Sequence, residues 1–152
     1  MKTILTPVDF SPATRDVVRA TLALASPLGA HIFLLHSLQP PLITTDYGIG
    51  VEVVQESIAL NEKAATRQLD HLRKLLTTQG LVVDTLLVNG LPAHNIAAQA
   101  AEVGADYIIL GSHGHTAFYE LLVGSTTHAV LQKSPCPVIV VPPSKKKRAK
   151  KR

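Results

Sequence analysis

The sequence predicts one α/β domain, built on a five-stranded parallel sheet in the order 3-2-1-4-5 with helices on both faces. Short runs rich in β-branched residues alternate along the chain with longer segments of helical periodicity, which is typical of βαβ units. The 152 residues, 46% hydrophobic and 17% charged, suit one globular domain. At this length the core needs neither metal nor crosslinks. The composition excludes disordered, collagen-like and disulfide-rich classes of protein.

The expected strands are short apolar runs, most of them without polar alternation. Strands that are covered by helices on both faces have this pattern. They occupy residues 3–8, 31–37, 81–88, 106–110 and 137–141.

Four helices are expected between these strands, because apolar residues recur there at helical spacing before a glycine or proline. The first has Ser11 as its N-cap and Pro12 as its first residue, and ends at Gly29. The others cover about 51–79, 92–103 and 126–133. The long second helix should bury one continuous face, formed by Val54, Ile58, Ala65, Leu69, Leu72 and Leu76.

The connection 38–50 is longer than the 2–6 residues usual in α/β units. Two interpretations stay open for it: a lid or partner surface, and a surface excursion without function.

The basic character of the chain belongs to its last residues. Seven of the 15 Lys and Arg lie within residues 145–152, so the remainder carries 8 basic and 11 acidic residues. We therefore expect a mildly acidic domain over residues 1–143 and a basic tail over 144–152. A tail without large apolar residues should be disordered.

Features of the amino-terminal end and the cysteine usage predict a cytoplasmic protein. Pro7 and Asp9 interrupt the apolar stretch that a signal peptide would need, and no run approaches the roughly 20 apolar residues of a membrane span. The single Cys136 cannot form an internal disulfide, which favours a reducing compartment and a packed thiol.

Glycines and hydroxyls gather after the fourth strand. Gly111-Ser112-His113-Gly114 follows it directly, and Gly124-Ser125-Thr126 opens the last helix. Glycines allow close approach of backbone N–H groups, and a helix N-terminus favours an anion, so the pattern suits a phosphate chain. The alternative is that the glycines only form a turn and Ser125 only caps its helix.

The expected topology places an acidic residue near these glycines. In a sheet of this order, ligands bind outside the carboxyl ends of the first and fourth strands, where Pro7-Val8-Asp9 and Gly111 lie. Asp9 could accept hydrogen bonds from ribose hydroxyls, or it could orient the turn near Ser11.

The spacing Gly111-x2-Gly114-x9-Gly124-Ser125 is similar to the G-x2-G-x9-G-[S/T] motif of the ATP-binding branch of the universal stress protein family. Segments along residues 2–142 occur in the family's order. They are Ile4-Leu-Thr-Pro-Val-Asp9-Phe-Ser11, Leu34-Leu-His36, Gly90-Leu-Pro92, Asp106-Tyr-Ile-Ile-Leu-Gly-Ser-His-Gly114 and Pro135-Cys-Pro137-Val-Ile-Val-Val.

The resemblance implies a dimeric, cytoplasmic stress-response protein that binds ATP with Mg²⁺. It implies that Asp9 holds the ribose, the backbone at Ser37 holds the adenine, and the glycine segments hold the phosphates. The implied site residues are Pro7, Val8, Asp9, Ser37, Gly111, Ser112, His113, Gly114, His115, Gly124, Ser125 and Thr126. Two positions depart from relatives: His115 replaces a common Lys or Arg, and Ser37 replaces an apolar residue.

Other chemistries find little support. The chain has no P-loop, no complete dinucleotide-binding fingerprint and no nucleophile elbow around Ser112. His113 and His115 lack nearby partners for a metal site, and His36 fits a hydrogen-bonded core position. We expect no catalytic residue and a nucleotide that acts as a regulatory ligand. A slow ATPase or self-phosphorylating protein using Ser112, Ser125 or Thr126 is the enzymatic alternative.

Two further expectations concern partners. Residues 138–141 form an apolar edge strand that should pair with a second copy of the chain. The tail is either a solubilising terminus or a site for nucleic acid or acidic lipid. In the second case a chain ending at Ser144 should lose that binding and keep ATP and the dimer.

Overall fold

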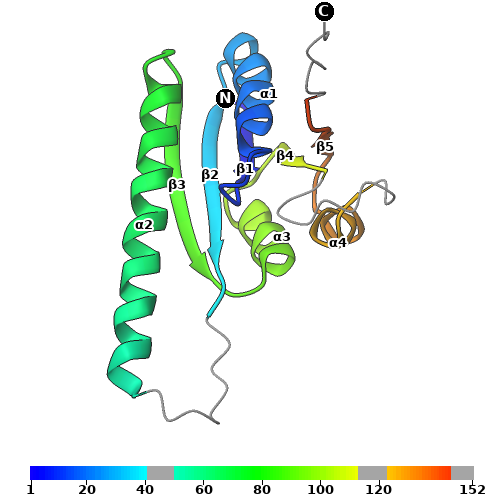
Figure 1. Cartoon of the computed structure of the whole chain (residues 1–152). Helices are drawn as coiled ribbons and strands as arrows, with labels where there is room; N and C mark the ends of the chain where they lie inside the picture. The colour runs from blue at the N-terminus through cyan, green and yellow to red at the C-terminus, as the bar shows by residue number, and fades with distance from the viewer. Residues whose placement is uncertain (41–49, 113–122, 145–152) are drawn as a thin grey trace, which may run out of the picture.

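The computed structural model describes residues 1–40, 50–112 and 123–144. They form one parallel sheet in the order β3-β2-β1-β4-β5, with helices on both faces (Figure 1). The predicted fold class and strand order are thus confirmed. The elements are β1 (Thr3–Pro7), α1 (Thr14–Leu28), β2 (His31–Leu38), α2 (Val51–Thr77), β3 (Val82–Asn89), α3 (Pro92–Glu102), β4 (Tyr107–Gly111), α4 (Ser125–Lys133) and β5 (Val138–Val141).

Two hydrophobic clusters, one on each face of the sheet, explain why the strands lack polar alternation. Successive side chains of a strand point to opposite faces, so Ile4 joins one cluster and Leu5 the other. Helices α1 and α2 cover the first cluster, where Leu69 is buried. Helices α3 and α4 cover the second, where Ile96 and Val130 are buried. In the described part of the chain, no helix is both long and apolar enough to cross a membrane.

Helix α1 begins later than expected. Its first residue is Thr14 and its N-cap is Ala13, so the expectation of a cap at Ser11 and a first helical residue at Pro12 is wrong. The backbone N–H of Ser11 donates to Asp9 Oδ1 at 2.9 Å, and that of Thr14 donates to the Ser11 carbonyl at 3.0 Å. These bonds form a turn before the helix, which is the other structure that Ser and Pro favour.

The remaining boundaries agree with the expected ones to within two residues. Gly29 ends α1 with φ +57°, a conformation that glycine adopts without strain. In the long connection, Leu38 belongs to β2 and Gly50 is the N-cap of α2. Residues 41–49 lie outside the described part of the chain, and so do residues 145–152 of the tail.

Helix α2 is buried along only part of its length, which corrects the expectation of a continuous buried face. Leu69 and Leu76 are each 1% exposed, whereas Ile58, on the same stripe, is 42% exposed. The first turns of α2 extend beyond the ends of the strands (Figure 1). The apolar pattern continues there, but no strand of the sheet lies beneath it.

This difference predicts unequal costs for two similar substitutions on one stripe. Leu69→Ala should lower the free energy of unfolding by about 2–5 kcal/mol, because it leaves a cavity in the core. Ile58→Ala should change it by about 0.5 kcal/mol or less, as for other surface positions. Urea unfolding of the two variants measures both values. Equal costs would contradict the exposure of the amino-terminal half of α2.

Candidate functional site

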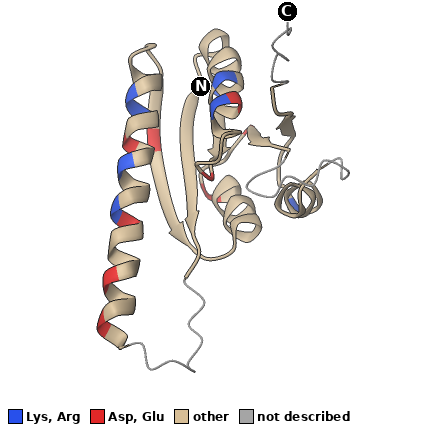
Figure 2. Cartoon of the chain, in the orientation of Figure 1, with Lys and Arg blue, Asp and Glu red and all other residues tan. Residues whose placement is uncertain are grey.

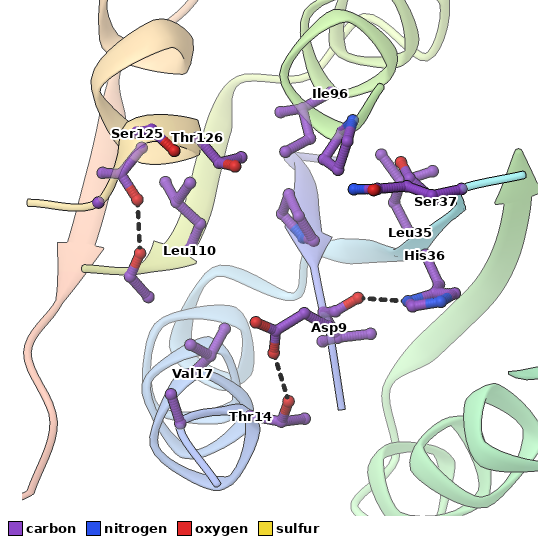
Figure 3. A pocket seen from close by; sticks show the side chains of 18 residues that line it. Asp9, Thr14, Val17, Leu35, His36, Ser37, Ile96, Leu110, Ser125 and Thr126 are labelled. Atoms are coloured by element: carbon purple, nitrogen blue, oxygen red, sulfur yellow. Dashed lines mark hydrogen bonds between the residues drawn. The ribbon is translucent and has the colours of Figure 1, made fainter. Parts of the chain in front are cut away.

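A cavity of about 430 Å³ opens at the carboxyl edge of the sheet, where the strand order reverses between β1 and β4. This is the expected place for a ligand in such a sheet. Figure 3 shows side chains from β2, α1, α3 and α4 arranged around the cavity. Eight of the predicted site residues line it: Pro7, Val8, Asp9, Ser37, Gly111, Gly124, Ser125 and Thr126.

Four predicted site residues are not among the described lining of the cavity. Ser112 is buried behind it, where its backbone N–H donates to the Val141 carbonyl at 3.0 Å. His113, Gly114 and His115 lie outside the described residues. The middle of the predicted glycine motif therefore stays a prediction.

Asp9 orients the turn before α1 and lines the cavity, while its contact with a ribose stays a prediction. Its Oδ1 accepts hydrogen bonds from the Ser11 backbone at 2.9 Å and from the Thr14 hydroxyl at 3.5 Å, so it orients the turn before α1 (Figure 3). The same carboxylate forms part of the cavity wall. It therefore presents negative charge and hydrogen-bond acceptors between the two ends of the cavity.

One end of the cavity is the amino terminus of α4. Gly124, not Ser125, is the N-cap of this helix, and no side chain caps it. The alternative in which Ser125 only caps the helix is therefore wrong, because Ser125 is its first residue. The first intrahelical bond runs from the His128 N–H to the Gly124 carbonyl at 2.9 Å. The N–H groups of the three residues before His128 thus precede the helical ladder and are suited to an anion.

Thr127 is a positioning residue that the sequence analysis missed. Its hydroxyl is buried and donates to the Gly111 carbonyl at 2.8 Å. The Gly124 backbone N–H also donates to the Ser112 carbonyl, at 2.7 Å. These bonds hold the start of α4 against the end of β4. The only sequence signal for Thr127 is its place as the third residue after Gly124.

The opposite end of the cavity is largely apolar. Leu35 of β2 and the residues Pro92 and Ile96 of α3 form its wall beside Ser37 (Figure 3). These residues were not predicted. Residues 90–92 did mark where α3 begins at this edge, but helical spacing alone does not show which turn faces a cavity.

The Ser37 hydroxyl is held from behind the cavity wall. Asn95 is 6% exposed, and its Nδ2 donates to the Asn89 carbonyl and to Ser37 Oγ, both at 3.1 Å. Because a carbonyl only accepts, the first bond fixes the orientation of the amide. Ser37 Oγ is therefore an acceptor toward Asn95.

His36 is a hydrogen-bonded residue at the edge of the core, as expected. Its Nδ1 donates to the Val8 carbonyl at 2.8 Å, and its ring lies 4.3 Å from the Phe10 ring between centroids. The carbonyl acceptor fixes the proton on Nδ1. His36 thus supports the segment that carries Asp9.

Metal and thiol chemistry find no further support. Within residues 1–40, 50–112 and 123–144, no cluster of three or more His, Cys, Asp or Glu could hold a metal ion. Cys136 packs against the second hydrophobic cluster, and partial burial raises the pKa of its thiol. It is a packed thiol, as its flanking prolines suggested.

The family model described as "Universal stress protein family" matches residues 1–142. A universal stress protein of Bacillus subtilis, YxiE, is 31% identical over 143 residues, which cover 91% of this chain and 97% of the relative. The universal stress protein MJ0577 of Methanocaldococcus jannaschii is 31% identical over 92% of this chain and 94% of its own.

Solved structures agree with this relationship. The structure of MJ0577 superimposes with a TM-score of 0.83, covering 95% of this chain and 98% of its own, at 31% identity. That of UspA from Lactobacillus plantarum gives 0.81 at 26% identity, covering 92% and 97%. A universal stress protein from Archaeoglobus fulgidus, solved in complex with dAMP, is 24% identical, has a TM-score of 0.64 and covers 93% and 98%. Together with the family match over almost the whole chain, these similarities show that the protein belongs to the universal stress protein family.

Proposed function

We propose that this chain binds ATP in the cavity between β1 and β4 and that the nucleotide acts as a regulatory ligand. The observation that carries the proposal is the order in which different chemical groups line the cavity from one end to the other. Backbone donors of α4 lie at one end, the Asp9 carboxylate lies between, and Leu35, Pro92 and Ile96 lie at the other end. A nucleoside phosphate has matching parts in the same order: an anion, a hydroxylated sugar and a flat base.

The family supports a nucleotide as the class of ligand. One relative of the same fold was solved with dAMP and another with cAMP. Both are under 25% identical to this chain. They therefore support the capacity of this fold to bind a nucleotide, but they do not identify which nucleotide this chain binds. The choice of ATP rests on the resemblance of the 111–126 segment to the family's ATP-binding motif.

Mg²⁺ would enter this site together with the phosphates. Proteins hold this ion with one or two carboxylates and the oxygens of the substrate. Ser125 and Thr126 offer hydroxyls at the α4 end of the cavity, and Asp9 is the one carboxylate in the described lining. If Mg²⁺ entered with the nucleotide, the Ser125 and Thr126 hydroxyls are the groups at this end of the cavity that could hold it beside the phosphates.

A ligand role fits the described wall better than fast hydrolysis. Phosphoryl transfer needs a group that positions the attacking water and a cation that stabilises the transition state. Within the described ranges, neither Lys nor Arg lines the cavity. Slow hydrolysis or transfer to Ser125 or Thr126 is the alternative, favoured by the exposure of both hydroxyls at the α4 end.

Calorimetric titration of the purified protein with Mg-ATP tests the proposal. We expect saturable binding at one site per chain, and adenine nucleotide in an acid extract of the protein. The absence of both would overturn the assignment. Turnover near the enzyme median of roughly 10 per second would favour the enzymatic alternative instead.

We also propose that β5 pairs with β5 of a second copy. It is the outer strand of the sheet beside β4, and its four residues are half-buried within the chain. Ile139 packs on one cluster and Val140 on the other, so both faces are covered. The backbone N–H and carbonyl groups on the outer edge of β5 are then the groups to which a second copy would form hydrogen bonds.

A further inference from the structure

The base end of the proposed nucleotide site offers mostly apolar surface. Leu35, Pro92 and Ile96 form its wall. None of the described lining residues is Lys or Arg, and Figure 2 shows the cations of the helices on α1, α2 and α4. A base carries nitrogen and oxygen atoms on its edge, and these atoms lose their hydrogen bonds to water in such surroundings. Recognition of a base at this end therefore depends on neutral hydrogen-bonding groups of the wall.

The Ser37 hydroxyl is such a group, and it has a free proton. Ser37 lines the cavity beside Leu35 (Figure 3). Its Oγ accepts a hydrogen bond from Asn95 Nδ2 at 3.1 Å. A hydroxyl donates one proton, and an amide nitrogen does not accept it. Within residues 1–40, 50–112 and 123–144, no hydrogen bond uses this proton. The Ser37 hydroxyl is therefore available to donate to a ligand in the cavity.

Asn95 is held in one orientation. Its side chain is buried, at 6% exposure, and Nδ2 also donates to the Asn89 carbonyl at 3.1 Å, so both amide protons are bonded. The Gly90 backbone N–H donates to the Leu38 carbonyl at 2.9 Å and ties the turn before α3 to the end of β2. A buried amide leaves such bonds only at the cost of unpaired polar atoms. Asn95 thus keeps Ser37 Oγ an acceptor on its side and leaves the Ser37 proton to the cavity.

Gln39 differs from Ser37 although it also lines the cavity from the β2 side. It is exposed, and no hydrogen bond to another described residue orients its amide. A glutamine amide can turn either its oxygen or its nitrogen toward a ligand. Of these two side chains, only Ser37 has a fixed preference, which is for an acceptor atom.

We propose that Ser37 and Asn95 form a pair that selects the base: the Ser37 hydroxyl, oriented by Asn95, donates a hydrogen bond to a ring nitrogen of the bound purine. Ser37 is then a specificity-determining residue, and Asn95 is a positioning residue that acts through it. The inference rests on the proposed function. It adds a side-chain contact to the backbone contact at Ser37 that the sequence resemblance implies.

Two substitutions of nearly the same shape test the contact. Ser37→Thr keeps the hydroxyl, whereas Ser37→Val replaces it by a methyl group. Each protein and the unaltered chain are titrated by calorimetry with Mg-ATP and with 1-deaza-, 3-deaza- and 7-deaza-ATP, in which one ring nitrogen is replaced by C–H. The unaltered chain and Ser37→Thr should bind one of these analogues about three- to tenfold more weakly than ATP, as expected for one neutral hydrogen bond.

This particular loss should disappear in Ser37→Val, because the valine has no proton to donate. The difference between the two variants should be the same at low and at high salt, since salt screens charges and not a neutral hydrogen bond. A hydroxyl with only a structural role would change stability, measured by urea unfolding, without changing the discrimination between ATP and the analogues.

Asn95→Asp tests the positioning role. A carboxylate has no proton to give to Ser37, so the Ser37 hydroxyl should donate to it and present only lone pairs to the cavity. The variant should therefore discriminate among the analogues as Ser37→Val does, although the serine is still present. Full discrimination in a folded Asn95→Asp protein would overturn the role of Asn95. If this variant does not fold, the comparison of Ser37→Thr with Ser37→Val decides the proposal alone.

The remaining outcomes separate the inference from the function on which it rests. If the unaltered chain binds ATP and every analogue is discriminated equally by Ser37→Thr and Ser37→Val, the base is selected by other groups. The inference would then be wrong and nucleotide binding would stand. If the unaltered chain binds neither ATP nor the analogues, the proposed function is overturned, and with it the inference.

Discussion

Ser125→Glu should weaken Mg-ATP binding at least about a hundredfold while leaving the fold intact. Ser125 is the exposed first residue of α4 and lines the cavity. A carboxylate there would occupy the helix N-terminus in place of the phosphates and repel them at close range. The same carboxylate interacts favourably with the helix dipole, so stability should stay equal or rise by about 0.3–1 kcal/mol. Calorimetry and thermal unfolding measure the two effects.

Ser125→Glu should weaken ATP binding while its stability stays equal or rises. A loss of binding in this variant is therefore a direct effect on the site and not a result of unfolding. Glutamine has nearly the same size as glutamate but no charge. Ser125→Gln should therefore weaken Mg-ATP binding by only about tenfold or less. Undiminished ATP affinity in a folded Ser125→Glu protein would show that the phosphates do not lie at α4. The site assignment would then be wrong.

Val140→Pro should convert the proposed dimer into a folded monomer. The N–H of Ile108 donates to the Pro137 carbonyl, and that of Ser112 donates to the Val141 carbonyl. In a parallel pair, every second residue faces the same neighbour, so Val140 directs its backbone to the outer edge. Proline there removes an outward donor and adds a ring at the pairing edge, with little effect on the bonds to β4. Light scattering at micromolar concentration measures the mass.

The neighbouring position provides the control. Ile139 is paired with Ile109 of β4, and its backbone N–H and carbonyl face that strand. Ile139→Pro should therefore destabilise the chain itself by about 3 kcal/mol or more, as proline does where it removes a backbone hydrogen bond. A Val140→Pro protein that is still dimeric would show that the copies associate through another surface. A monomeric unaltered protein would show that β5 does not pair at all.

The fold could be predicted from the sequence because local and global signals agree. Doubly covered strands such as 31–37 must be apolar throughout, and helices must end where glycine or proline follows. Right-handed crossovers then leave few possible topologies. The ends of β1 and β4 and the start of α4 were placed correctly for the same reason: the carboxyl ends of parallel strands share one edge of the sheet.

Parts of the site could not be predicted, because they depend on contacts between distant segments. Asn95 reaches Ser37 across 58 positions of the chain, and Thr127 reaches Gly111 across 16. Each bond is made by an ordinary polar residue within a helix, and periodicity does not show its direction. The turn at Asp9 likewise competes with helix formation at Ser11, and local propensity does not decide between them.

The sequence by itself determined the class of fold, the order of its strands and the edge where its glycines, hydroxyls and Asp9 gather. Only the tertiary structure decided which apolar residues are buried, as the contrast between Leu69 and Ile58 on one helix shows. It also decided that the chain after β5 returns to α1, where the Ser144 N–H donates to Asp16 Oδ2. The physical reason is the same in each case. Pattern and propensity act within a few residues, whereas burial and long-range hydrogen bonds depend on which segments the packed chain brings together.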